Sequence, residues 1–79
     1  MESRIIHESI IKDQIDEIIG AIIKARKKKK ITQAELAKIV GINRSTITRL
    51  ESFSFVPTLP VILSIFKALD ISFNLSFKN

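Results

Sequence analysis

Polar side chains suited to contacting nucleic-acid bases cluster in one short stretch of the sequence. All of them donate or accept hydrogen bonds and none is acidic; they are Asn43, Arg44, Ser45, Thr48 and Arg49. Such groups pair with base edges in the major groove of DNA, where each base pair shows its own pattern of donors and acceptors. The stretch therefore predicts a set of base-contacting residues on one helix, with an ordinary solvated polar face as the alternative.

The residues around this stretch predict two short helices joined at a glycine. Apolar residues recur at helical spacing on both sides of the joint, and they are Leu36, Ala37 and Val40 before it and Ile47 and Leu50 after it. Gly41 can take the positive φ that ends a helix in a sharp turn, and Asn43 is suited to the N-cap of the second helix. The small side chain of Ala37 lets the two helices cross closely. This pattern is typical of a helix-turn-helix.

The distribution of charge separates the two interpretations of the polar face. The 79-residue chain has a formal net charge of +5. Residues 24–49 hold nine basic residues against one acidic residue, which gives +8, whereas residues 1–23 hold two against five, which gives −3. The positive charge is thus concentrated on the predicted helix-turn-helix and the segment that leads into it, and a polyanion such as double-stranded DNA is the natural partner.

Composition argues against several other classes of protein. A chain of 79 residues makes one domain, over 1–79. With no Cys and one His, it has no ordinary zinc site, and we expect no metal and no cofactor. It has no signal peptide and no apolar span for a bilayer, so we expect a cytoplasmic protein without a membrane partner. No catalytic residues are found in a plausible arrangement, so we expect no enzyme activity.

The segments before the helix-turn-helix are predicted less evenly. Residues 1–12 form an N-terminal arm whose apolar pairs lack a clear period, and they suit a short strand, an extra turn of helix or a floppy arm. A helix is predicted over about residues 14–28, with Asp13 as its N-cap. Its apolar stripe consists of Ile15, Ile18, Ile19, Ile22 and Ala25.

The basic run of residues 27–30 ends against the first turn of the next helix. A solvated linker is the plain interpretation, and a nuclear-localisation or membrane-surface patch is a weaker one. The N-terminus of a helix offers unpaired N–H groups and a positive dipole end to a phosphate. We therefore predict DNA phosphate contacts from Lys29, Lys30 and Thr32.

The C-terminal third is predicted to contain a loop, a helix and a strand. Residues 51–57 form the loop, and Thr58 caps a helix whose buried face is Leu59, Ile62, Leu63, Phe66 and Leu69. Apolar and polar residues then alternate over 71–77, which is the pattern of a half-buried strand. A single strand needs a neighbour, either residues 4–7 of the same chain or its twin in a second chain.

We prefer a homodimer built on paired C-terminal strands. The loop aromatics either fold back on the core or meet a partner, and a dimer contact suits a chain this small. The predicted dimer interface is Ile71, Phe73, Leu75 and Phe77 of the strand, together with Phe53 and Phe55 of the loop.

Three segments resemble the core of the Cro/repressor-type (Xre) helix-turn-helix family: residues 32–37, 40–42 and 45–51. Residues 63–77 are similar to the HipB-type antitoxins within that family. The resemblance implies a mostly α, lambda repressor-like domain of four to five helices with a C-terminal β-strand. The chain departs from the family at Lys30 and Phe53, where many members have glycine, and this puts the two turns in question.

The resemblance also implies roles for single residues. Gln33, which opens the second helix, would hold a phosphate and brace the first of the base-reading residues. Arg44 would be the main direct base contact. Arg26 and Glu51 would form a buried salt bridge between the first helix and the end of the third.

The implied function is a sequence-specific DNA-binding transcriptional regulator, namely an antitoxin of a type II toxin-antitoxin system that represses its own operon. It would bind a palindromic operator as a homodimer and would also bind a cognate toxin, such as a kinase of the HipA type. Two alternatives stand beside this one. They are a stand-alone, phage-like Xre repressor and a protein-interaction module that no longer binds DNA.

Overall fold

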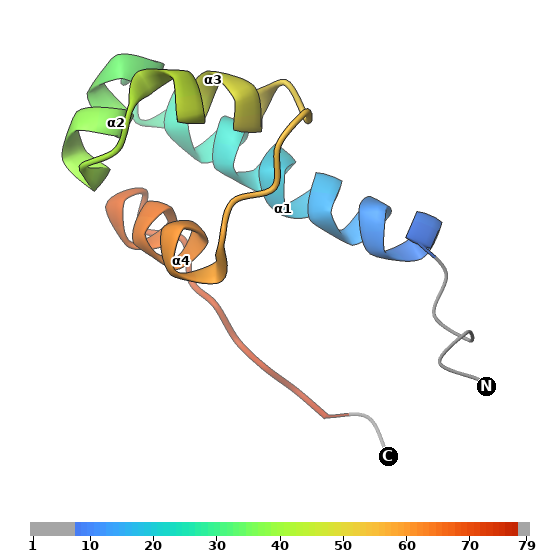
Figure 1. The fold of residues 1–79 in the computed structure, drawn as a ribbon. Coiled ribbons are helices and arrows are strands. Elements are labelled where there is room, and N and C mark those ends of the chain that lie inside the picture. The colour runs from blue at the N-terminus through green and yellow to red at the C-terminus, as the bar shows by residue number, and fades with distance from the viewer. Residues whose placement is uncertain (1–7, 78–79) are drawn as a thin grey trace.

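The structure is a computed structural model that describes residues 8–77 of the chain. Within these residues it contains four helices. They are α1 (Glu8–Lys28), α2 (Gln33–Val40), α3 (Arg44–Glu51) and α4 (Leu59–Ala68). The helices α2, α3 and α4 lie around the C-terminal half of α1, and the N-terminal half of α1 projects beyond them (Figure 1). The mostly helical architecture predicted from the sequence is confirmed.

The first helix is longer than the sequence indicated. It begins at Glu8 rather than at residue 14, so residues 8–12 of the predicted arm are helical and Asp13 lies inside the helix instead of capping it. Nothing in residues 8–13 breaks a helix, and the exposed Lys12–Asp16 ion pair, at 3.1 Å, supports this turn as an i,i+4 pair. The remainder of the predicted arm, residues 1–7, lies outside the described residues.

The core draws side chains from all four helices. Its buried members are Ile19, Ile22, Leu36, Ala37, Ile47, Leu50, Ile65, Phe66 and Leu69. The predicted face of α4 is wrong in part, because Leu59 and Leu63 are 63% and 40% exposed while Ile65 is buried. This helix is apolar nearly all round, so periodicity alone does not show which side faces inward.

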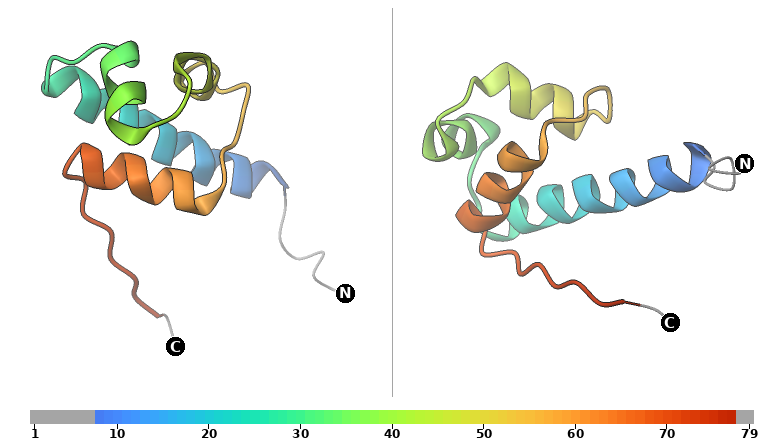
Figure 2. Two further views of the ribbon diagram at one scale, coloured as in Figure 1. Left: turned by 60° about the vertical axis from the view of Figure 1, so that its left-hand side comes forward. Right: turned by 60° about the horizontal axis from the view of Figure 1, so that its bottom comes forward.

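The turn between α2 and α3 has the predicted geometry. Gly41 has φ 84° and ψ 34°, in the left-handed region, and its N–H donates to the Ala37 carbonyl. Thr32 begins α2 as the N-cap of a reciprocal capping box, in which Thr32 and Glu35 each accept the other's backbone N–H. Asn43 and Thr58 occupy the N-caps of α3 and α4, but neither makes a side-chain capping bond. The three short helices α2, α3 and α4 lie at steep angles to one another (Figure 2).

Lys30 and Phe53 adopt backbone conformations that favour glycine. Their φ angles are 60° and 64°, within the left-handed region. These are the two positions at which the chain departs from the resembled family pattern, in which glycine is common, and both have a backbone conformation that suits glycine. A side chain in this region costs about 1–2 kcal/mol, because its Cβ crowds the following carbonyl.

Replacing Lys30 with glycine is expected to stabilise the domain. Relief of the left-handed strain, about 1–2 kcal/mol, outweighs the extra chain entropy that glycine loses on folding, about 0.5–1 kcal/mol. We expect a net gain of about 0.5–1 kcal/mol, or a rise in melting temperature of about 2–8 °C for a domain of this size. The matched control is Lys28→Gly, which lies in the last turn of α1 and should lower the melting temperature. Destabilisation by both variants would contradict the strain at Lys30.

The predicted C-terminal β-strand is wrong for the single chain. Residues 71–77 are extended, but the backbone of 72–77 makes no hydrogen bond with the rest of the described chain. The segment leads away from the helices (Figure 2), and Phe73, Leu75 and Phe77 are 54%, 77% and 89% exposed. A strand forms only where a neighbour supplies donors and acceptors, and alternation of residue types does not reveal whether that neighbour exists within one chain.

Candidate nucleic-acid interface

The outer face of α3 is built as the sequence suggested. Ile47 and Leu50 are fully buried beneath it. The five predicted base-contacting residues are all exposed on the outside or at the start of this helix: Asn43, Arg44, Ser45, Thr48 and Arg49. Their contact with bases remains a prediction. The structure brings them together on one accessible face.

An ion pair beneath this face ties α3 to α1. Arg26 Nε donates to Glu51 Oε2 at 2.7 Å, and Nη2 donates to Glu51 Oε1 at 2.9 Å. The side chains of Arg26 and Glu51 are only 11% and 6% exposed. Hydrogen bonding to Glu51 raises the pKa of Arg26 above its ordinary value, against the opposing effect of burial. This is the bidentate geometry that fixes a carboxylate in direction as well as in position.

Arg26 also fixes the turn that leads into α2. Its Nη1 donates to the backbone carbonyl of Ile31 at 2.8 Å. One guanidinium thus holds the end of α3 and the residue just before the N-cap of α2. This side chain of α1 therefore positions the two helices of the helix-turn-helix relative to each other.

Gln33 connects this ion pair to the outer face. Its Nε2 donates to Glu51 Oε1 at 3.0 Å, and its Oε1 accepts a hydrogen bond from Thr48 Oγ1 at 2.8 Å. The resemblance implied that Gln33 braces the first base-reading residue, whereas in the structure it braces Thr48. The amide has two hydrogens and Glu51 takes one, so the predicted phosphate contact remains chemically possible for the other.

The predicted phosphate contacts at Thr32, Lys30 and Lys29 lie in different environments. Thr32 and Lys30 are exposed near the start of α2, where the carboxylate of Glu35 accepts from the Thr32 N–H at 2.7 Å. Lys29 Nζ instead donates to Asp70 at 2.7 Å and so lowers the pKa of that carboxyl group. Lys29 therefore has to leave Asp70 to reach a phosphate. Both groups are exposed, so that pairing is weak.

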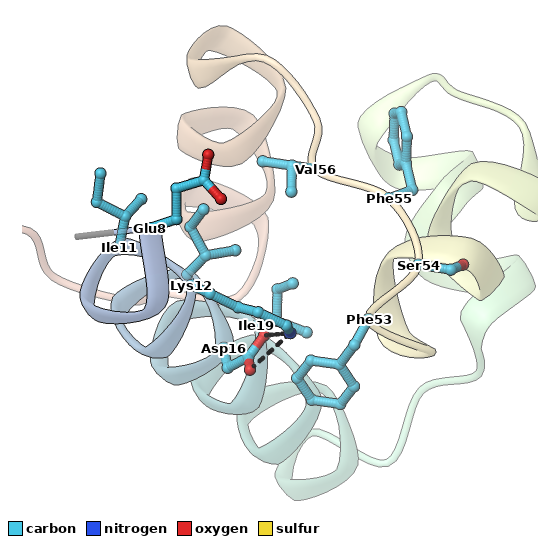
Figure 3. Close-up of a pocket in the computed structure, with 10 residues that line it drawn as sticks. Glu8, Ile11, Lys12, Asp16, Ile19, Phe53, Ser54, Phe55 and Val56 are labelled. Atoms are coloured by element: carbon cyan, nitrogen blue, oxygen red, sulfur yellow. Dashed lines mark hydrogen bonds and ion pairs between the residues drawn. The ribbon is translucent and has the colours of Figure 1, made fainter.

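The two loop aromatics point to different sides of residues 52–56 (Figure 3). Phe53 points toward α1 and lines a cleft of mixed character. The cleft is also lined by apolar and charged side chains of α1, namely Ile11, Ile15, Ile19, Glu8, Lys12 and Asp16. Phe55 is half-buried against the core, and the Arg49 guanidinium lies 4.7 Å from the centre of its ring. The predicted dimer contact of both rings remains a prediction, and both have partners within the chain.

Phe55 is a neighbour of the predicted base-contacting residue Arg49 that the sequence did not reveal. It supports Arg49 through a cation–π contact, and the Arg49 carbonyl accepts hydrogen bonds from Ser52 and Ser54. Phe55 lies six positions after Arg49, across a helix end and a loop, and no periodic pattern describes that relation. Its effect is to restrict where Arg49 can point.

Comparison with known protein families gives a match for this chain. The family described as Helix-turn-helix matches residues 22–75, more than half of the chain. The chain belongs to the Xre/Cro-like helix-turn-helix family. Comparisons with curated proteins and with solved structures found no match.

Family membership indicates a DNA-binding transcriptional regulator. The matched region of this helix-turn-helix protein starts within α1 and includes the Arg26–Glu51 ion pair and all of α3. It also includes the two hydrogen bonds by which Gln33 connects Glu51 to Thr48, here called the Gln33 bridge. Over residues 8–77 no helix has the length and apolarity needed to cross a bilayer. The same residues contain no group of three or more His, Cys, Asp or Glu side chains that could hold a metal ion.

Proposed function

We propose that this helix-turn-helix protein is a sequence-specific transcriptional repressor that binds a palindromic operator as a homodimer. The observation that carries the proposal is the exposed polar face of α3 held on a largely buried ion pair. Arg26, Glu51 and Gln33 fix the far end of this face as well as stabilising the fold. A fixed face suits base readout, because hydrogen bonds to base edges weaken steeply when the distance or angle departs from the ideal.

Charge supports the same partner. The net charge of +8 over residues 24–49 lies on α2, most of α3 and the segment before them, and only residues 1–23 carry a net negative charge. Phosphates attract such a surface without regard to sequence, and base contacts then select the site. We propose that the protein has no catalytic activity and needs no cofactor for this function.

The proposed dimer contact is the extended C-terminal segment. Its exposed side chains Phe73, Leu75 and Phe77 are apolar, and its backbone donors and acceptors suit pairing with the same segment of a second chain. A twofold dimer presents two α3 helices to successive major grooves, about 34 Å apart. This spacing corresponds to a palindrome with half-sites one helical turn apart.

Within this proposal, the finer role is that of an autorepressing antitoxin of a type II toxin-antitoxin system in the cytoplasm. Its support is the similarity of residues 63–77 to HipB-type antitoxins. A toxin encoded next to this gene, such as a kinase of the HipA type, would be its protein partner. A stand-alone repressor of the Xre family is the second candidate, and retention of the protein by the purified product of the neighbouring gene separates the two.

A titration of labelled duplex DNA tests the proposed function. We expect two protein chains per operator duplex, and binding to random DNA that weakens steeply with salt. A dimer neutralising about six phosphates gives a log–log slope of affinity against salt of about −5. Fluorescence anisotropy between 50 and 200 mM salt measures the slope, and sedimentation of the complex measures the stoichiometry. Absence of binding even at the lowest salt would instead favour a protein-interaction module.

A further inference from the structure

The Gln33 bridge fixes the direction of every hydrogen bond between Arg26 and Thr48. Arg26 donates two hydrogen bonds to Glu51, which therefore faces it as a carboxylate and can only accept. Its Oε1 atom also accepts from Gln33, so the group of Gln33 that faces Glu51 must be the amide nitrogen. The carbonyl oxygen of Gln33 is then the group that faces Thr48.

This order leaves the Thr48 hydroxyl with one arrangement. A carbonyl oxygen has no hydrogen, so the 2.8 Å contact with Gln33 Oε1 uses the only proton of Thr48 Oγ1. The lone pairs of the same oxygen are not used by that bond, and Thr48 is exposed on the outer face of α3. Toward anything that approaches this face, the hydroxyl is an acceptor and not a donor.

We infer that Thr48 selects a base with an exocyclic amino group, adenine or cytosine, over guanine or thymine, and that Gln33 is the positioning residue that gives it this preference. In the major groove only adenine N6 and cytosine N4 offer a donor to an acceptor, whereas guanine and thymine present acceptors in those places. Two acceptors facing each other leave both groups without a hydrogen bond after water is displaced. The inference rests on the proposed DNA-binding function and names a chemical preference at one position of the operator.

The remaining polar residues of the face lack this restriction. Arginine and asparagine side chains carry donors whatever their surroundings, and asparagine carries an acceptor as well. The hydroxyl of Ser45 makes no hydrogen bond within residues 8–77, so it can rotate to donate or to accept. Ser45 therefore provides an internal control of the same chemical type on the same helix.

Selection from a random duplex library tests the inference. The position read by Thr48 is found as the one whose preference disappears in Thr48→Val, which keeps the shape of the side chain and removes the hydroxyl. At that position the wild-type protein should favour adenine or cytosine by about three- to tenfold, the value of one neutral hydrogen bond. Thr48→Ser, which keeps the hydroxyl, should retain the preference.

The variant Gln33→Met tests the origin of the preference. It removes the acceptor that holds the Thr48 proton, so the hydroxyl can also donate. At the position read by Thr48, the preference for adenine or cytosine over guanine or thymine should therefore fall to within about twofold of unity. The control is the operator position whose base preference disappears in Ser45→Ala. At that position Gln33→Met should show the same preference as the wild-type protein. Circular dichroism checks that each variant remains helical. The preference between bases at one position is a ratio of affinities, so a uniform loss of phosphate affinity does not change it.

Three results would overturn the inference. They are a wild-type preference for guanine or thymine at this position, a preference that Gln33→Met leaves intact, and a Thr48→Val variant that alters no position. All three require that the protein binds DNA, so they differ from failure of the proposed function, in which the wild-type protein selects no sequence at all.

Discussion

Replacing Glu51 with alanine is expected to lower the free energy of unfolding by about 3 kcal/mol. The change leaves the guanidinium of Arg26, whose side chain is 11% exposed, without the carboxylate that it contacts twice. It also removes the acceptor of Gln33. A buried charge that loses its partner costs about 3–5 kcal/mol, and we use the lower end because this pair lies at the edge of the core.

The loss is large compared with the total stability. A domain of 79 residues has a free energy of unfolding of about 4–12 kcal/mol, so the variant should be partly unfolded at the lower end of that range. Urea denaturation followed by circular dichroism measures the change, as a fall in the midpoint with little change in slope.

The chain provides a matched control for this prediction. The Lys29–Asp70 pair has an equally short distance, 2.7 Å, but both side chains are exposed. Asp70→Asn keeps a residue that tolerates the positive φ of 57° at this position. It should leave the urea midpoint nearly unchanged, because water screens exposed pairs. Similar losses from Glu51→Ala and Asp70→Asn would show that burial does not decide the strength of these pairs.

Replacing Arg44 with alanine is expected to weaken operator binding by about 1–3 kcal/mol, or about 5- to 150-fold. Arg44 is the first residue of α3 and is exposed, and an arginine in a major groove can donate two hydrogen bonds to one guanine. Binding to random DNA should change little, since phosphates attract the whole basic region rather than one side chain. Competition between operator and random duplexes, measured by anisotropy, gives both affinities.

Lys38→Ala is the control for Arg44. Lys38 is an exposed cation in the last turn of α2 and is not one of the predicted base-contacting residues, and its loss removes the same charge. It should affect operator and random DNA equally, if at all. Equal losses on both DNAs in Arg44→Ala would reduce Arg44 to a phosphate contact and would leave the readout to its neighbours.

The helix-turn-helix itself could be predicted from the sequence because its determinants are local. Gly41 marks a backbone conformation that few other residues adopt. Leu36, Ala37 and Val40 before it, and Ile47 and Leu50 after it, recur at helical spacing. The polar face of α3 then follows by exclusion from the buried positions. The family resemblance gave the Arg26–Glu51 pair, which connects residues 25 positions apart and has no local signature.

The remaining features depend on contacts between distant residues. Phe55 beneath Arg49 and Lys29 beside Asp70 are set by how loops pass over helices. Alternation over residues 71–77 indicates an extended segment but not the presence of a partner for it. The start of α1 does not follow from the sequence, because Asp13 suits an N-cap equally well whether or not the helix already exists before it.

Methylation protection by dimethyl sulfate on operator DNA tests the central claim most directly, because the reagent attacks guanine N7 in the major groove and adenine N3 in the minor groove. If α3 lies in the major groove, guanine N7 should be protected in two patches about one helical turn apart, and adenine N3 should stay reactive. Protection confined to adenine N3, or none at saturating protein, would show that the outer face of α3 does not read the duplex.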